Sequence, residues 1–348
     1  MHIDELLKTA VQKEASDIHL SVASPPIFRI HGNLVRFGDT PLTGEQTEEM
    51  AKYLLGNRWE TFEKEREYDF AYEIPGVSRF RLNIFHQKRA ISIAARVIPD
   101  KVPTIDQLDL PPILKEIMNR PHGLVLVTGP AGSGKSTTLA AMIDFVNQTM
   151  EKHIITLEDP IEYIHNHAQS IVQQREVGID TKQFSNGLRA ALRQDPDVIL
   201  VGEMRDLETI RTAITAAETG HLVLATLHTN SAAQTITRII DVFPPHQQEQ
   251  IRIQLSSVLE AVISQRLLKR SDKPGRIAAT EILIRHPSIA NLIRNNKIDQ
   301  IQNVLQTGKA LGMHTLQMSI RDLLNRGIIS HEQAKPFFST VGDFDGNV

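Results

Sequence analysis

The sequence predicts an α/β protein in which a small α+β domain precedes a domain built on a parallel sheet. From Tyr68 to Ile98, apolar and polar residues alternate and β-branched residues are frequent, a pattern typical of antiparallel strands with one buried face. After His122 the pattern changes to short, continuous apolar runs separated by helical stretches, which indicates parallel strands covered on both faces. Between the two patterns lies a proline-rich stretch that favours neither helix nor strand.

The composition argues against several classes of function. The 348 residues include 38 basic and 41 acidic side chains, for a net charge of −3, whereas a generic nucleic-acid-binding domain is expected to have a pI above about 9. The absence of cysteine excludes disulfides and zinc–thiolate sites. The apolar runs are far shorter than the about 20 residues of a membrane-spanning helix, and no signal peptide is expected. We therefore expect a cytoplasmic protein that contacts a membrane only through a partner.

The first domain is expected to cover residues 1–98. It begins with an amphipathic helix over residues 1–14. Short strands are then expected at residues 17–20, 27–31 and 34–37. Thr43 and Gln46 have the spacing of a capping box, which predicts the start of a helix. Residues 68–98 are expected to form an antiparallel meander of three strands.

The remainder of the chain is expected to divide into four parts. These are a linker at 99–112, a core domain at 113–272, a hairpin and helices at 273–336, and a flexible tail at 337–348. Strands of the core domain are expected at residues 124–128, 154–157, 198–201 and 222–226. The hairpin is expected around residues 277–284, and four short amphipathic helices follow it.

A glycine-rich loop directly follows the first strand of the core domain and precedes a helical stretch. It fits the phosphate-loop pattern G-x-x-x-x-G-K-[ST]. Such a loop surrounds phosphates with backbone N–H groups, its lysine reaches the terminal phosphates of ATP, and its serine hydroxyl binds Mg²⁺. The expected nucleotide-binding residues are Gly129, Pro130, Ala131, Gly132, Ser133, Gly134, Lys135, Ser136 and Thr137.

A carboxylate that helps to hold Mg²⁺ is expected where a neighbouring parallel strand ends. Asp197 and Glu203 flank the apolar strand at 198–201, and the strand separates them by about 20 Å. Ligands bind at the carboxyl ends of the strands in open α/β sheets. Glu203 follows the strand and is therefore the expected Mg²⁺ ligand, partly through water, whereas Asp197 belongs to the opposite edge.

Three more carboxylates follow the strand at 154–157, namely Glu158, Asp159 and Glu162. Glu158 and Asp159 are expected to contribute to the Mg²⁺ site. Glu162 is the first candidate for the base that orients the attacking water, and Glu203 is its competitor. A solvated acidic loop is the alternative explanation, and the residues alone leave both choices open.

Two histidines flank the apolar strand at 222–226. A shared metal is excluded, because the strand holds His221 and His228 more than about 20 Å apart. His228 follows the strand and is expected to contact the γ-phosphate. His221 precedes it, at the edge where a structural or subunit-contact role is expected.

Arginines on the predicted meander are candidates for contacts with the transferred phosphoryl group of a neighbouring subunit. Arg79 and Arg81 face the same way on one strand, and Arg96 ends the next strand. A solvated face of the sheet is the alternative explanation for all three.

In combination, these motifs resemble those of the secretion ATPase superfamily, and specifically the PilT-type retraction ATPases of bacterial type IV pili. Residues 15–20 (ASDIHL) resemble the N-terminal signature of that family, and residues 129–137 its Walker A motif. The Asp box, the Walker B region and the His box of the family are similar to residues 155–163, 192–209 and 220–232.

The resemblance implies a PAS-like N-terminal domain, a RecA-like P-loop ATPase domain with a C-terminal helical region, and a homohexameric ring. It implies ATP and Mg²⁺ as cofactors, and pilin disassembly and twitching motility as the work done. It also favours functional roles for His221 and His228, and catalytic roles for Arg81 and Arg96. The implied partners are other copies of the chain, an inner-membrane platform protein and further pilus ATPases, at the cytoplasmic face of the inner membrane. No nucleic acid and no direct membrane insertion are expected.

The alternatives to retraction are pilus extension, type II secretion and a DNA-uptake pseudopilus. ATPases of these kinds usually carry a tetracysteine zinc motif, and this chain has no cysteine. In the late motif at residues 288–294, Ala290 replaces the arginine that is usual in the retraction family, so an accessory role in retraction is a further alternative. A nucleotide-gated scaffold and a nucleic-acid translocase are the remaining ones.

Overall fold

The computed structural model of the chain describes residues 2–30, 32–98 and 101–338. Two compact bodies are present, one formed by residues 1–101 with 160–164 and the other by the rest of the chain. Most of the predicted tail, the predicted strand end at His31 and the first two residues of the predicted linker lie outside the described residues.

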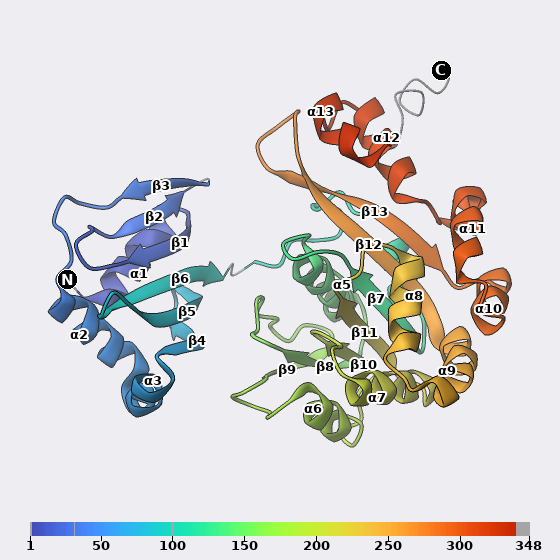
Figure 1. The fold of residues 1–348 in the computed structure, drawn as a ribbon, viewed down its shortest axis with the longest axis horizontal. Coiled ribbons are helices and arrows are strands. Elements are labelled where there is room, and N and C mark those ends of the chain that lie inside the picture. Colours follow the sequence, from blue (N-terminus) through green and yellow to red (C-terminus); the bar gives the residue numbers. More distant parts are fainter. Residues whose placement is uncertain (1, 31, 99–100, 339–348) are drawn as a thin grey trace. The chain divides into compact units, whose positions relative to one another are not determined.

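The first body is built on a six-stranded sheet with the order β3-β2-β1-β6-β5-β4, in which all neighbours are antiparallel (Figure 1). Its strands are β1 (Ala15–Leu20), β2 (Ile27–Ile30), β3 (Asn33–Arg36), β4 (Glu67–Ile74), β5 (Ser78–Gln87) and β6 (Ala90–Ile98). Its helices are α1 (Ile3–Gln12), α2 (Gly44–Leu55) and α3 (Trp59–Glu65). The predicted strands and meander are confirmed, whereas α3 was not predicted because one turn of apolar spacing does not define a helical period.

The core of the first body forms where α1 and α2 cover the sheet. Helix α1 buries Ile3, Leu6 and Leu7, as its amphipathic pattern predicts. Trp59, the only tryptophan of the chain, is partly buried in this body. Phe62 of the same helix is fully buried, and its ring stacks on that of His86 on β5 with the centroids 5.0 Å apart, so this aromatic contact fixes α3 against the sheet.

The second body is built on a seven-stranded sheet with the order β13-β12-β7-β11-β10-β8-β9 (Figure 1). The strands are β7 (Gly123–Thr128), β8 (His153–Glu158), β9 (Ile171–Glu176), β10 (Val198–Val201), β11 (Leu222–Leu227), β12 (Leu259–Lys269) and β13 (Arg276–Ile284). All neighbours are parallel except β12 and β13. Every residue of β7, β10 and β11 is buried, which confirms the predicted parallel sheet.

Two strands of this sheet were not predicted, namely β9 and β12. The segment predicted as a hairpin around residues 277–284 is the antiparallel edge strand β13, paired with β12 from Ala261–Ile284 to Lys269–Arg276. The hairpin therefore belongs to the sheet that carries the phosphate loop. It is not a separate feature of the C-terminal region.

The helices of the second body are α4 (Ile113–Met118), α5 (Lys135–Thr149), α6 (Phe184–Ala191), α7 (Leu207–Glu218), α8 (Ala232–Asp241), α9 (Pro245–Val258), α10 (Pro287–Arg294), α11 (Ile301–Thr307), α12 (Leu316–Asn325) and α13 (His331–Ala334). Helix α12 forms a small separate core with the β12–β13 hairpin, in which Ile320 and Leu323 pack with Leu268 and Ile277. Within the described residues, no helix combines the length and apolar character needed to cross a membrane.

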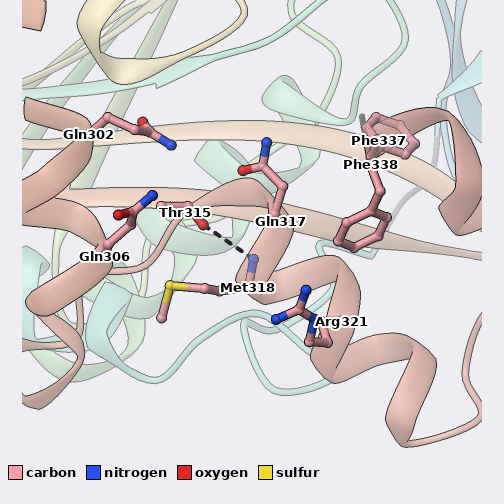
Figure 2. A pocket seen from close by; sticks show the side chains of 8 residues that line it. All are labelled: Gln302, Gln306, Thr315, Gln317, Met318, Arg321, Phe337 and Phe338. Carbon is pink, nitrogen blue, oxygen red and sulfur yellow. Dashed lines mark hydrogen bonds between the residues drawn. The ribbon is translucent and has the colours of Figure 1, made fainter. Parts of the chain in front are cut away.

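An open pocket of about 370 Å³ lies between α11 and α12 (Figure 2). Its lining combines glutamine amides with aromatic and aliphatic groups: Gln302, Gln306, Thr315, Gln317, Met318, Arg321, Phe337 and Phe338. The guanidinium of Arg321 lies 5.7 Å from the ring centroid of Phe338. None of the residues predicted to act in the site lines this pocket.

The capping box predicted from Thr43 and Gln46 is present at the start of α2. The hydroxyl of Thr43 accepts from the backbone N–H of Gln46 at 3.2 Å, and the Gln46 side chain accepts from the backbone N–H of Thr43 at 2.9 Å. Thr43→Ala should lower the free energy of unfolding by about 1 kcal/mol, because it leaves an end N–H of the helix without its acceptor. Urea unfolding measures this, and Thr61→Ala at an exposed position inside α3 is the control that should cause no loss. An equal effect of both changes would contradict the capping role.

Candidate active site

The phosphate loop connects the buried strand β7 to helix α5. The strand ends at Thr128 and the helix begins at Lys135. In the loop between them, Gly129, Gly132 and Gly134 have φ angles of 146°, 72° and 88°, which side-chain-bearing residues rarely adopt. The three glycines therefore allow the tight path that directs backbone N–H groups toward a ligand.

One of these glycines is also confined by its neighbours. A Cβ atom at Gly129 would lie 2.5 Å from the backbone oxygen of Gln265 on β12 and 2.5 Å from the hydroxyl of Ser133. At Gly132 a Cβ atom would meet nothing within 4 Å. Gly129 is therefore required for close packing of two backbones, and Gly132 only for its backbone conformation.

The polar groups of the loop fit a phosphate ligand. The Nζ of Lys135 donates to the carbonyls of Gly129 at 2.9 Å and Pro130 at 3.0 Å, so its charge lies directly over the loop. Among the described residues, the hydroxyls of Thr128 and Ser133 are buried without a hydrogen-bond partner. Buried hydroxyls of this kind usually have a partner, which a bound phosphate or its water would supply.

The parallel register brings the predicted acid and histidine together at the same edge of the sheet. Glu203 follows β10 and His228 follows the adjacent β11. One carboxylate oxygen of Glu203 lies 3.3 Å from His228 Nε2, and the other lies 2.7 Å from Nη2 of Arg205. Glu203 and His228 therefore share one site, as the position of each after its strand predicts.

The Glu203 carboxylate is held in its charged form. Burial by itself raises its pKa, but the hydrogen bond from Arg205 and the positive charges of Arg205, His228 and Lys135 outweigh burial, and the net pKa is below the ordinary value. The influence of Lys135 also shows that the carboxylate and the phosphate-loop lysine are within electrostatic reach of each other.

Asp197 and His221 lie at the opposite edge of the sheet, where β10 and β11 begin, as predicted from their positions before these strands. Asp197 accepts from Lys152 Nζ at 3.0 Å and from the backbone N–H of His153 at 2.9 Å. His221 Nδ1 makes a 3.0 Å hydrogen bond with the carbonyl of Ala216. Both side chains thus have local structural partners, far from Glu203.

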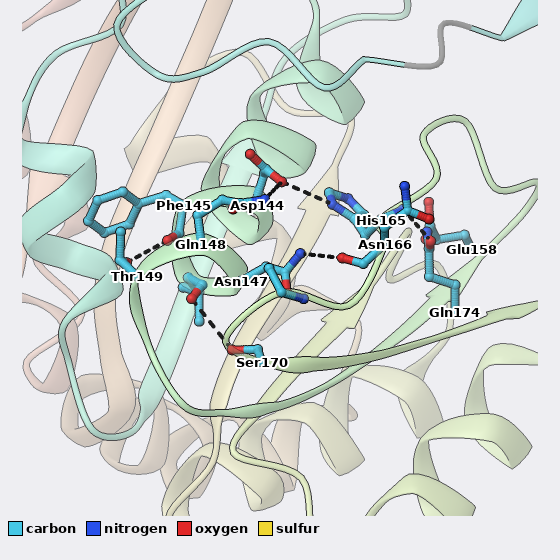
Figure 3. A network of polar contacts seen from close by, with 12 residues as sticks. Asp144, Phe145, Asn147, Gln148, Thr149, Glu158, His165, Asn166, Ser170 and Gln174 are labelled. Atoms are coloured by element: carbon cyan, nitrogen blue, oxygen red, sulfur yellow. Dashed lines mark hydrogen bonds and ion pairs between the residues drawn. The ribbon is translucent and has the colours of Figure 1, made fainter.

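The carboxylate at the end of β8 is tied to the neighbouring strand β9. The Glu158 carboxylate accepts from Thr156 Oγ1 at 2.6 Å and from Gln174 Nε2 at 3.0 Å. The amide oxygen of Gln174 in turn accepts from the backbone N–H of His165 at 2.8 Å (Figure 3). A single glutamine therefore bonds to both ends of residues 158–165, the acidic segment that contains Glu158, Asp159 and Glu162.

Helix α5 holds the same segment from its other side. Asn147 Nδ2 donates to the carbonyl of Asn166 at 2.7 Å, and its Oδ1 accepts from the backbone N–H of Ala168 at 3.1 Å (Figure 3). His165 is buried beside Asp144, and burial lowers the pKa of its imidazole more than Asp144 raises it. The residues after the acidic segment are thus fixed to the helix that begins at the phosphate loop.

The other predicted carboxylates differ in their surroundings. Glu162 lies in residues 160–164, which group with the first body, whereas Glu203 belongs to the second. The hydrogen bond to Glu203 and the charge of that carboxylate raise the pKa of Arg205, and the charge of Asp159 adds to this effect. The described residues contain no group of three or more side chains that could hold a metal ion. An Mg²⁺ ion usually takes one or two protein ligands together with phosphates and water, a requirement that Ser136 and Glu203 can meet.

The predicted arginines lie on adjacent strands of the first body. Arg81 on β5 and Arg96 on β6 are register partners. The Nε of Arg96 donates to an Asp17 carboxylate oxygen at 2.8 Å. Burial raises the pKa of Asp17, but hydrogen bonds from Arg96 and Ser16 outweigh it and lower the pKa overall. Arg96 therefore has a carboxylate partner within its own body.

Three residues at this site were not singled out from the sequence: Gln174, Arg205 and Gln265. Arg205 follows Glu203 by two positions, and this proximity was an available signal. Gln174 and Gln265 lie on β9 and β12, the two strands that were not predicted, so nothing indicated that their side chains face the site.

Residues 1–335 match the family described as "Type II/IV secretion system protein", and the chain belongs to that family. The protein named "Type IV pilus retractation ATPase PilT" of Pseudomonas aeruginosa is 50% identical over 336 residues, which are 96% of this chain and 97% of that protein. The "Twitching motility protein" of Neisseria gonorrhoeae is 48% identical over 332 residues, or 95% of this chain and 88% of that protein.

Among solved structures, one titled "Crystal Structure of the Pilus Retraction Motor PilT and Bound ADP" matches with a TM-score of 0.92 and 47% identity over 99% of each chain. The resemblance to PilT-type retraction ATPases and the predicted fold class are thereby confirmed.

The two kinds of glycine in the phosphate loop give the first prediction for this site. Gly129→Ala should abolish ADP binding, because neither the backbone oxygen of Gln265 nor the loop can move away cheaply. Gly132→Ala should cost only backbone strain, about 1–2 kcal/mol of stability. ADP titration and urea unfolding of both variants measure this. Full ADP affinity in Gly129→Ala would contradict the packing argument.

The pair of Asp17 and Arg96 gives a prediction about pH. Because the pKa of Asp17 is lowered in the folded protein, its stabilisation is fully present above the unfolded pKa of about 3.9 and is lost as pH falls through the folded pKa. Asp17→Asn should therefore cost about 0.5–1 kcal/mol at neutral pH and nothing in strong acid.

Urea unfolding over a pH series measures this difference. Asp39→Asn at an exposed position is the control, with an expected change below about 0.5 kcal/mol. A cost of Asp17→Asn that does not depend on pH would show that the ion pair does not stabilise the first body.

Proposed function

We propose that this chain is an ATP-hydrolysing motor that drives retraction of a type IV pilus and so twitching motility. The observation that carries the proposal is the meeting of Lys135, Glu203 and His228 at one sheet edge, in a chain of this family. The relatives named for pilus retraction and twitching match nearly the whole chain.

In this proposal the phosphate loop and Lys135 hold the β- and γ-phosphates of ATP, and the first turn of α5 adds its partial positive charge. Ser136 and Glu203 hold Mg²⁺, which neutralises developing charge on the phosphates when bound. Because the hydrogen bond and positive charge of Arg205 help to keep Glu203 ionised, its carboxylate is a weak proton acceptor and is available as a ligand of the metal ion. Glu162 then remains the better candidate for orienting the attacking water, and Glu158 and Asp159 support the site from β8.

The proposal includes a homohexameric ring in which arginines of one subunit reach the nucleotide of the next. Arg81 is the better candidate for this role, since Arg96 is engaged by Asp17 within its own body. An inner-membrane platform protein and further pilus ATPases are the proposed partners, at the cytoplasmic face of the inner membrane. An accessory ATPase is the second candidate, because Ala290 on α10 replaces the arginine usual in the late motif.

Steady-state ATP turnover with Mg²⁺ tests the enzyme. Lys135→Ala and Glu203→Gln should each lower turnover at least about a hundredfold, because each removes a charge that faces the transferred phosphoryl group or its metal. Lys182→Ala at an exposed position of the same body should leave turnover unchanged. Equal rates for all of these proteins would exclude ATP hydrolysis at this site.

Deletion of the gene tests the work that hydrolysis supports. Loss of twitching with surface pili retained or increased is expected for a retraction motor. Loss of surface pili would instead identify an extension motor, and twitching that persists with reduced force would identify an accessory role.

A further inference from the structure

Gln265 is a buried polar residue that the chemistry proposed above does not use. It lies on β12, one position beyond Ser264, which pairs with Thr128 at the end of β7. Its exposed fraction is 1%. A buried amide is costly unless its donor and acceptor groups are bonded, so the partners of this side chain show what it is for.

Both ends of the Gln265 amide bond to the region of the phosphate loop. Its Nε2 donates to the carbonyl of Ser133 at 2.7 Å, and its Oε1 accepts from Thr138 Oγ1 at 3.0 Å. Ser133 lies within the loop and Thr138 in the first turn of α5. One side chain therefore connects the loop to the helix whose N-terminus faces the phosphates.

Gln265 also confines the loop by close packing. Its carbonyl oxygen lies 2.5 Å from the position that a Cβ atom of Gly129 would take. Its Nε2 lies 3.2 Å from the position that a Cβ atom of Gly134 would take. The first and last glycines of the loop thus both pack against this residue. Since Gly129 and Gly134 bound the phosphate-binding turn, a shift of Gln265 changes the positions of the N–H groups between them.

We infer that Gln265 is a positioning residue for the nucleotide: it sets the conformation of the phosphate loop through Ser133 and Thr138 without touching the phosphates. The inference rests on the proposed function, because it assumes that the loop binds a nucleotide. It assigns a role in ATP binding to the β12–β13 hairpin, which lies outside the Walker A motif, the Asp box, the Walker B region and the His box.

The neighbouring strand supplies a matched control. Thr280 on β13 is the register partner of Gln265 and is equally buried, at 1%. Its hydroxyl bonds to His314 Nε2 at 2.9 Å, in the C-terminal region. Thr280→Val therefore removes a buried hydrogen bond from the same hairpin without changing any contact to the phosphate loop.

The experiment measures the affinity of the full-length chain for a fluorescent ADP analogue, together with the rise in melting temperature that ADP causes. Gln265→Ala should weaken ADP binding about tenfold, as expected for two lost buried hydrogen bonds. Gln265→Glu keeps an acceptor for Thr138 but directs a carboxylate oxygen at the Ser133 carbonyl, so it should bind ADP at least as weakly. Thr280→Val should bind ADP within about twofold of the unchanged protein, because the hydrogen bond that it removes is made to His314 and not to the phosphate loop.

The effect of ADP on melting separates a positioning role from a structural one. A positioning role requires that the ADP-induced rise shrinks in both Gln265 variants and is kept in full by Thr280→Val. Equal ADP-induced rises in all variants, whatever their melting temperatures without ADP, would overturn the inference. If one Gln265 variant does not fold, the other decides by the same criterion; if neither folds, Gln265 supports the whole fold and the inference is overturned.

The partner of the amide provides an internal check. Thr138→Val removes one end of the same contact, so its effect on ADP affinity should be less than additive with that of Gln265→Ala. Strict additivity would contradict the inference. If the unchanged protein fails to bind ADP, the proposed function fails instead.

Discussion

The close approach of two backbones, at Gly129 and at the carbonyl of Gln265, is the constraint on which the site depends. It exists because β12 pairs in parallel with β7 up to Ser264 and Thr128. The phosphate loop therefore begins, at Gly129, directly beside the backbone of Gln265 on β12. The loop must then turn through glycine conformations before α5 begins. Strand pairing in the core thus determines the shape of the phosphate-binding turn.

Charge balance at the carboxyl edge follows from the same parallel register. Glu203 and His228 end adjacent strands, and Arg205 and Lys135 supply positive charge beside them. A carboxylate in such surroundings stays ionised. The acidic segment after β8 is held separately. Gln174 on β9 bonds to Glu158 at its start and to His165 at its end, and Asn147 on α5 bonds to the next residue, Asn166. The middle of that segment, with Glu162, belongs to the other body.

Local patterns predicted what depends on local chemistry. The capping box of Thr43, the glycine spacing of the phosphate loop and the order of Glu203 after its strand are all readable from neighbouring residues. Strand β12 was missed because α9 ends at Val258 and the strand starts at Leu259, with no glycine or proline between them. Strand β9 is an edge strand in which only Ile171 and Val172 are apolar, so it shows no extended apolar run. The contacts of Gln174 and Gln265 depend on strand order, which a single sequence does not reveal, whereas the pairing of Arg205 with Glu203 is local.

The placement of Trp59 has a spectroscopic consequence. The one tryptophan and all four tyrosines of the chain fall within residues 1–101 and 160–164, which form the first body. The body that carries the phosphate loop therefore contains only phenylalanine as a near-ultraviolet chromophore of this kind. Tyrosine and tryptophan fluorescence of the whole chain therefore comes from the first body alone, and Tyr163, next to Glu162, places one of these chromophores beside a residue proposed to act on ATP.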